Sequence, residues 1–294
     1  MEKAQEVTAT QSPSKISMWA SDCQQKWAYI YIHGLRRPPA AALMYGRAWD
    51  KAISDGDIGY WAEVLRDGKH LTVNQAREKF ASIWDTEAAE VEDWGDDDKG
   101  VLLDCGTQGM GLWVPEVAVK HYPHSLQRRF QFGVEDDSGK WSLNGVIDTT
   151  LRDLREKQDK AVLHDDKTAK QSWLTKTGPN AGKPSRKATG GLQAAAYTLG
   201  VKVDPKLQGE VLHDRLVFDV HVKTKVPQQQ AIEVKVTPQE HEDYLRLAGA
   251  VRLQQQASIQ AGYFVPNRQS NLCSKRWCPF HEECVREHGG EVPD

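Results

Sequence analysis

The spacing of apolar residues changes near residue 100, and this change limits the chain to folds that combine helices with a sheet. Before it, apolar residues recur with the period of a helix over residues 14–34, 40–55 and 72–90. After it, they alternate or form short blocks that are typical of strands, over residues 112–120, 128–134, 141–151, 160–168, 213–223 and 230–236. Two further helices are predicted over residues 189–200 and 238–261. We therefore expect an α/β fold with a mixed central sheet flanked by helices, whose first four strands form an antiparallel meander.

The composition is that of a globular protein. Of the 294 residues, 39% are hydrophobic and 27% are charged. No apolar run reaches the roughly 18 residues that cross a bilayer, and the first residues lack the apolar core of a secretion signal. We expect a cytosolic protein, in a bacterium or an infected host cell, with no membrane contact. Because the formal net charge is −3, any contact with DNA must come from local basic patches.

Two short acidic segments suggest a metal site. The first is Gly145-Val146-Ile147-Asp148, and the second is Asp165-Asp166-Lys167-Thr168. Residues i and i+2 of a strand share a face, so Asp165 and Lys167 emerge side by side, and pairing of the two strands would bring Asp148 next to Asp165. Two carboxylates and an ammonium suit phosphodiester hydrolysis with Mg²⁺ or Mn²⁺. An isolated D-x-K triplet is also common as an exposed charge pair at a strand end.

These segments are followed by Gln193-x-x-x-Tyr197 at the start of a predicted helix. Together they resemble the ordered motifs of the RecB-like nucleases of the PD-(D/E)xK superfamily, which include the AddB nuclease and the CRISPR-adaptation nucleases. The resemblance implies a restriction-endonuclease-like core in which Asp148 and Asp165 bind the metal and Lys167 assists catalysis. It also implies that Gln193 and Tyr197 lie beside the site and contact DNA.

Three positions qualify this resemblance. Glu116, in the strand-like segment VPEVAV, matches a glutamate that often precedes the first aspartate of such nucleases, and it could equally be an exposed strand residue. Asp50 stands where the family has the histidine of Gly-x-x-x-His, and its carboxylate could still be a metal ligand. His164 and Asp166 replace the usual apolar neighbours of D-x-K, so either they tune the site or the strand is more exposed than in relatives.

The cysteines are grouped near the C-terminus. Cys273, Cys278 and Cys284 are spaced closely enough to converge on one soft metal centre, and a cytosolic chain disfavours disulfides. The resemblance implies Cys23 as the fourth ligand of a 4Fe–4S cluster that joins the two ends of the chain in a helical subdomain. The alternative is zinc, held by the three cysteines with His281 or Cys23. Cys105, in LLDCGTQG, is expected to be a small buried residue.

Two other features bear on nucleic-acid binding. Residues 169–190 are predicted to form a long basic loop, whose cations could track phosphates or simply be solvated: Lys170, Lys176, Lys183, Arg186 and Lys187. Most of the ten tryptophans lie in apolar patterns and are predicted to pack in the core rather than to stack on bases, among them Trp19, Trp27, Trp84 and Trp141. Trp277 is expected to shield the cluster.

The predicted organisation has a disordered segment at 1–13, a helical region at 14–100 with the first cluster cysteine, a nuclease core at 101–262 and a cysteine segment at 263–294. The function expected from the resemblance is that of a metal-dependent DNA exonuclease in recombination, repair or phage DNA processing. It would act on linear or single-stranded ends, with a recombination or helicase protein as a further partner. The alternative is a DNA-binding or assembly module that keeps the fold and the cluster but has lost cleavage.

Overall fold

The computed structural model describes residues 2–136, 139–155, 160–177, 179–185, 192–270, 272–275 and 277–289. The chain divides into two compact units that each combine distant parts of the sequence. Unit 1 contains Met1–Ala40, Gln131–Gly145 and Pro238–Asp294. Unit 2 contains Ala41–Phe130 and Val146–Thr237. Each unit is described by itself.

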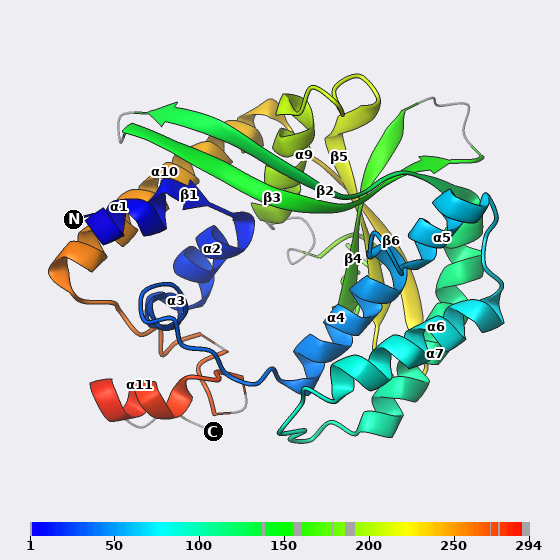
Figure 1. Ribbon diagram of the computed structural model, residues 1–294, viewed down its shortest axis with the longest axis horizontal. Coiled ribbons are helices and arrows are strands. Elements are labelled where there is room, and N and C mark those ends of the chain that lie inside the picture. The colour runs from blue at the N-terminus through cyan, green and yellow to red at the C-terminus, as the bar shows by residue number, and fades with distance from the viewer. Residues whose placement is uncertain are drawn as a thin grey trace. The chain divides into compact units, whose positions relative to one another are not determined.

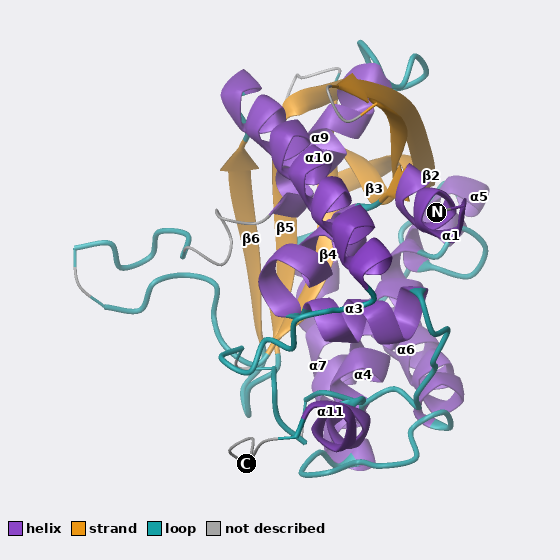
Figure 2. Cartoon of the chain, turned by 90° about the vertical axis from the view of Figure 1, so that its left-hand side faces the viewer, coloured by secondary structure: helices purple, strands orange, loops and turns teal. Residues whose placement is uncertain are grey.

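Unit 2 is built on a mixed sheet, as the sequence predicted. The strands are β2 (His121–Asp136), β3 (Gly139–Asp153), β4 (Ala161–Ala169), β5 (Val211–Val222) and β6 (Gln228–Lys235), although residues 131–145 of β2 and β3 are counted in unit 1. The pairs β3–β4 and β5–β6 are antiparallel, whereas β4 and β5 are parallel. Strand β2 pairs with β3. Figure 2 shows β4, β5 and β6 side by side.

Helices cover both faces of this sheet (Figure 1). The helices of unit 2 are α4 (Ala41–Ser54), α5 (Tyr60–Asp67), α6 (Val73–Ala88), α7 (Lys99–Glu116) and α9 (Leu192–Val203), of which α4, α7 and α9 contact the strands. The β4–β5 register pairs Asp165 with Phe218 and Thr168 with His221, so Asp165 and His221 face opposite sides. His221 lies against Gly109 of α7, while Asp165 accepts a hydrogen bond from Gln193 of α9. Helix α9 therefore covers the face opposite to α7.

The core of unit 2 is rich in aromatic side chains. It lies among α4, α5, α6 and α7, and its largest fully buried members include Trp49, Trp61, Phe80, Trp84 and Trp113. Their rings meet mostly edge to face, the favourable geometry for aromatic pairs. The predicted core position of Trp84 is confirmed here, and those of Trp19, Trp27 and Trp141 are confirmed in unit 1.

Unit 1 joins the two ends of the chain. Its elements are α1 (Glu2–Ala9), β1 (Thr10–Gln11), α2 (Pro13–Ser17), the π-helical turn η1 (Met18–Asp22), α3 (Gln24–Tyr31), α10 (Pro238–Ala261) and α11 (His281–His288). Strand β1 pairs in parallel with the first part of β3, and Gln11 Nε2 donates to Gln255 Oε1 of α10 over 2.9 Å. Trp19, Trp27 and Phe264 pack together.

The structure differs from the sequence predictions in four places. Residues 2–11 form α1 and β1 instead of a disordered segment, because contacts with α10 and β3 compensate for their polar composition. The predicted strand at 112–120 is wrong, because these residues complete α7 and the 3₁₀ turn η2 (Ala118–Lys120). Helix α5 was not predicted. The expected helix over 14–34 is interrupted at Cys23, which is extended (φ −163°, ψ 123°). None of the helices in the described ranges has the length and apolarity to span a bilayer.

Candidate active site

Strands β3 and β4 bring the two predicted acidic segments together. Thr149 pairs with His164 in the antiparallel register, so one further step sets Asp148 opposite Asp165. The predicted pairing of these strands is thus confirmed. Asp165 is completely buried, and its Oδ2 lies 2.5 Å from Nζ of Lys167 on the same face of β4. Asp148, Asp165 and Lys167 therefore form one cluster.

Helix α9 adds the two residues that the sequence placed beside this cluster. Gln193, in the first turn of α9, has its Nε2 3.3 Å from Asp165 Oδ1 and 2.8 Å from the hydroxyl of Tyr197. Burial raises the pKa of Tyr197, and the charges of Asp165 and Asp148 add to the effect. Tyr197 is therefore a neutral phenol that can donate a hydrogen bond at the edge of the cluster.

Helix α4 contributes a third carboxylate. Asp50 is half-buried, and its pKa is raised by burial, against the hydrogen bond from Ser54 and the charge of Lys167. The charges of Asp165 and Asp148 interact with Asp50 in turn, which puts all three aspartates within one electrostatic environment. The sequence expectation that Asp50 lies at the site agrees with this arrangement.

Three carboxylates and one ammonium leave the cluster with excess negative charge. The pKa of Asp148 is raised well above its ordinary value by burial, and then by the charge of Asp165 and a side-chain hydrogen bond to it. These causes disfavour the ionised form of Asp148, whereas the charge of Lys167 acts in the opposite direction. Burial acts to lower the pKa of Lys167, but Asp165 and Asp148 outweigh it and the pKa is raised, so the side chain stays charged.

The donor set of this cluster fits a divalent cation of the Mg²⁺ or Mn²⁺ type. Carboxylate oxygens are the hard ligands that such cations prefer, and a bound cation would stabilise the ionised form of Asp148. Within the described ranges, no three His, Cys, Asp or Glu side chains converge at metal-ligand distances.

Other predicted residues lie elsewhere or outside the described ranges. Glu116 is exposed at the last residue of α7, and none of the charges that shift the pKa values of Asp50, Asp148 or Lys167 belongs to it. In the basic loop, Lys170 pairs with Asp97 at 3.3 Å, whereas Arg186 and Lys187 lie outside the described residues.

His164, which precedes the D-x-K triplet, and Asp166, its middle residue, belong to a buried network that sequence reasoning missed in part. His164 and Asp166 are 4% and 8% exposed, so the idea that this strand is unusually exposed is wrong. His164 Nδ1 lies 2.6 Å from Oδ2 of Asp219 on β5. The pKa of Asp166 is raised well above its ordinary value by burial and by the charge of Asp219. An aspartate inside the apolar strand LVFDV was the available signal for Asp219.

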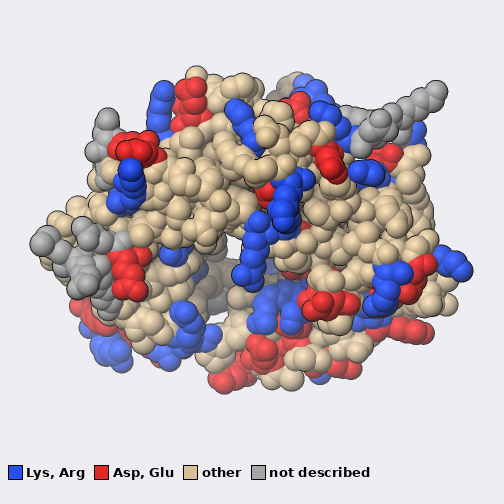
Figure 3. All heavy atoms as spheres, turned by 45° about the horizontal axis from the view of Figure 1, so that its top comes forward, with Lys and Arg blue, Asp and Glu red and all other residues tan. Residues whose placement is uncertain are grey.

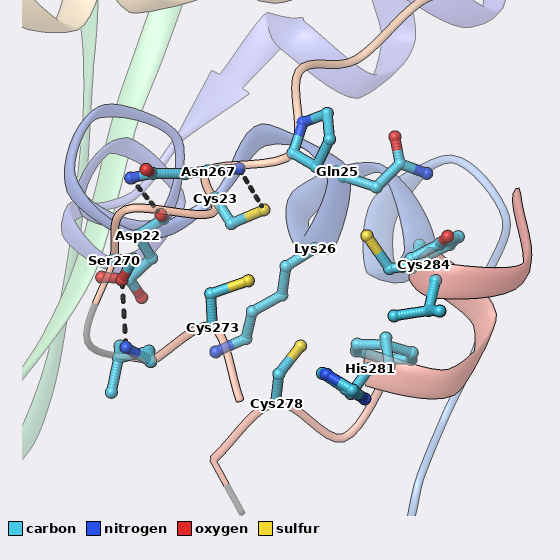
Figure 4. Close-up of a pocket in the computed structure, with 15 residues that line it drawn as sticks. Asp22, Cys23, Gln25, Lys26, Asn267, Ser270, Cys273, Cys278, His281 and Cys284 are labelled. Atoms are coloured by element: carbon cyan, nitrogen blue, oxygen red, sulfur yellow. Dashed lines mark hydrogen bonds between the residues drawn. The ribbon is translucent and has the colours of Figure 1, made fainter. Parts of the chain in front are cut away.

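A second candidate site lies in unit 1, where the four predicted cysteines line one pocket (Figure 4). Cys23 enters from the N-terminal segment, and Cys273, Cys278 and Cys284 enter from the C-terminal segment. The backbone N–H of Asn267 donates to Cys23 Sγ over 3.4 Å, and Asn267 Nδ2 donates to the carbonyl of Asp22. These bonds hold the two segments together at the pocket.

Burial and neighbouring thiols raise the pKa values of Cys273, Cys278 and Cys284. Burial raises the pKa of Cys284 to about 11, and Cys23 contributes next. The pKa values of Cys273 and Cys278 are also raised, with burial the largest cause in each case. Lys26, which reaches between the sulfurs in Figure 4, acts to lower the pKa of Cys278. Four soft donors in one pocket fit a thiolate-bound metal centre that supplies positive charge. Cys105 is half-buried in α7 of unit 2, 3.7 Å from His221 Nε2.

The comparisons with known proteins agree with the mixed-sheet fold. The profile of the PD-(D/E)XK nuclease superfamily matches residues 10–285. A solved structure from Eubacterium rectale, described as a "Putative exonuclease", is similar over 99% of this chain and 92% of its own, with a TM-score of 0.55 and 12% identity. The structure of SSO0001 covers 97% of this chain and 93% of its own at a TM-score of 0.39 and 11% identity, too low to support an argument. No curated protein gives a significant sequence match.

Proposed function

Because the chain belongs to the PD-(D/E)XK nuclease superfamily, we propose that it is a Mg²⁺- or Mn²⁺-dependent DNA exonuclease. One observation carries this proposal. Asp148 and Asp165 lie side by side through the β3–β4 register, with Lys167 paired to Asp165 and Gln193 hydrogen-bonded to it. Two carboxylates, an ammonium and an amide around one point are the groups needed to hold a cation and a phosphodiester.

Each residue has a role that follows from its place. Asp148 and Asp165 would hold the cation, and Asp50 would complete the ligand set from α4. Bound there, a divalent cation would polarise the phosphate and lower the pKa of a water molecule. Lys167, kept charged by Asp165 and Asp148, would position the attacking water and offset negative charge on the phosphate. Gln193 and the neutral phenol of Tyr197 can donate hydrogen bonds to the DNA backbone.

Exonuclease action on DNA ends is the finer part of the proposal. It is supported by the family motifs and by the name that the Eubacterium rectale structure carries. Basic and acidic side chains are interspersed on the face seen in Figure 3, which suits contact through local groups rather than through a broad basic surface. Recombination, repair or phage DNA processing is the expected setting, with a recombination or helicase protein as partner.

The proposed second cofactor is a 4Fe–4S cluster bound by Cys23, Cys273, Cys278 and Cys284. A single zinc ion draws its sulfur ligands to about 2.3 Å from one centre. The four thiols share one pocket, and for cysteines placed at both ends of the chain the family resemblance implies the iron–sulfur cluster. Zinc held by the same thiols is the alternative. Such a cluster would stabilise unit 1 rather than take part in cleavage.

A digestion assay with matched variants tests the nuclease. End-labelled linear duplex, linear single strands and closed circular DNA are incubated with the full chain while Mg²⁺ or Mn²⁺ is titrated. The wild type should release label from linear DNA and spare the circles. Lys167→Ala should lose about a hundredfold or more in rate, as removal of a charge-stabilising group does. Lys202→Ala, an exposed lysine on α9, should match the wild type.

The outcomes separate the alternatives. Cleavage of circular DNA would replace the exonuclease by an endonuclease. If neither the wild type nor Lys167→Ala cleaves, yet both bind DNA, the protein is a DNA-binding or assembly module instead.

A further inference from the structure

A serine at the end of α4 fixes one oxygen of Asp50. Ser54 is completely buried, and its Oγ lies 2.5 Å from Oδ1 of Asp50. The same hydroxyl is 3.0 Å from the backbone carbonyl of Asp50. A hydroxyl has one proton to donate, and the carboxylate is both the nearer and the more strongly accepting partner. This bond leaves the second oxygen of Asp50 for a cation.

Ser54 in turn receives a hydrogen bond from an unusual residue on β2. Gln127 Nε2 is 3.5 Å from Ser54 Oγ, across 73 residues of sequence. Among the described residues, Gln127 is the one non-glycine residue with a positive φ, at 45°. The backbone of a non-glycine residue is strained at this φ, and such strain persists where the surrounding structure requires it. The positive φ of Gln127 accompanies the orientation of its side-chain amide toward Ser54.

We propose that Ser54 and Gln127 are positioning residues that orient Asp50 as a metal ligand. The inference rests on the proposed function, and it explains how an aspartate on α4 can serve as a metal ligand. An aspartate side chain is flexible and shorter than a histidine, so a partner that fixes its rotamer lowers the cost of binding a cation. Gln127 donates to a lone pair of the Ser54 hydroxyl, and the hydroxyl proton of Ser54 then points to Asp50.

A merely structural role would look different. A serine that bonds to the carbonyl four residues earlier is common in helices, and it needs no carboxylate partner. Thr86 on α6 is such a case, with its hydroxyl 3.5 Å from the carbonyl of Ser82 and its side chain exposed. Thr86→Ala is therefore the matched control for Ser54→Ala.

The test is Mn²⁺ binding to the full chain, measured by calorimetry without DNA. Ser54→Ala should weaken the affinity about tenfold, the usual effect of removing a partner of a metal ligand, and Ser54→Thr should restore most of it. Gln127→Gly should also weaken Mn²⁺ binding, by less, while its melting temperature does not fall, because glycine adopts this φ without strain. Asp50→Ala should lose at least as much affinity as Ser54→Ala, and Thr86→Ala none.

The inference is overturned if Ser54→Ala or Asp50→Ala binds Mn²⁺ as tightly as the wild type. It is also overturned if Gln127→Gly keeps full affinity, because Gln127 would then serve only the backbone. A wild type that shows this pattern of affinities but cuts no DNA would refute the nuclease alone. A wild type that cuts DNA while Ser54→Ala retains full Mn²⁺ affinity would refute the positioning role alone.

Discussion

His221 of β5 lies in the aromatic core of unit 2. It is fully buried, stacks on Trp49 with ring centroids 4.1 Å apart, and lies against α7 at Gly109. Burial lowers its pKa from 6.5 to about 3, and the charge of Lys223 acts in the same direction. The fold therefore requires the neutral imidazole.

This depressed pKa predicts a loss of stability in acid. The unfolded chain takes up a proton on His221 below about pH 6.5, whereas the folded chain resists it down to about pH 3. The contribution of the neutral His221 side chain to the free energy of unfolding is therefore complete above pH 6.5. It falls as the pH is lowered through this window, by about 2 kcal/mol at pH 5. Urea unfolding at pH 7.5 and pH 5 should show a smaller difference for His221→Phe than for the wild type. Equal differences in the two proteins would show that His221 does not titrate in this range.

At the candidate site, strand periodicity and the family resemblance together predicted which side chains come close to one another. The closeness of Asp148, Asp165 and Lys167 follows from the two-residue repeat of paired strands, whereas the expectation that Gln193 and Tyr197 lie beside them came from the family resemblance. Ser54 and Gln127 could not be predicted in this way. Their contact joins a helix end to a strand 73 residues away and depends on one backbone angle that no local motif specifies.

Helix α7 shows what close packing demands of a whole element. Its glycines leave space for neighbouring side chains, since a Cβ on Gly106 would meet Phe80 at 2.0 Å and one on Gly109 would meet His221 at 2.4 Å. Asp98 caps its start by accepting from the N–H of Val101. The helical spacing of apolar residues is not apparent in α7, because it contains glycines, a proline at 115 and valines near its end. Residues 112–120 were therefore predicted as a strand.

The same packing gives a prediction for α7. Gly109→Ala should destabilise the protein by about 1 to 3 kcal/mol, because the new methyl group overlaps a buried ring that cannot move away. Gly56→Ala is the control, since its Cβ would have no atom within 4 Å. Chemical denaturation would measure both. A Gly109→Ala variant as stable as the wild type would mean that α7 and β5 separate easily, contrary to the burial of His221.

On the scale of the whole molecule, one compact unit is assembled from both ends of the chain and a segment from its middle. The long helix α10 was predicted with the observed bounds, because Pro238 is typical of a first turn and Gly262, with its positive φ, follows the last residue. The closeness of Cys23 to the three C-terminal cysteines was expected from the resemblance, and all four line one pocket. What fills that pocket was beyond prediction from spacing, because thiolates bind zinc and iron–sulfur clusters alike.

The cluster proposal predicts a selective loosening of unit 1. Cys278→Ser should remove the visible absorbance of anaerobically purified protein and its iron, whereas Cys105→Ser, in unit 2, should retain both. Metal binding at four ligands contributes folding free energy to the segments that carry them. Hydrogen exchange should therefore accelerate in residues 14–40 and 262–289 of Cys278→Ser, while β4 and β5 keep their protection. Zinc in place of iron in the wild type would replace the cluster by the mononuclear alternative. Uniform acceleration across both units would show that the thiol pocket supports the entire fold rather than the ends of the chain.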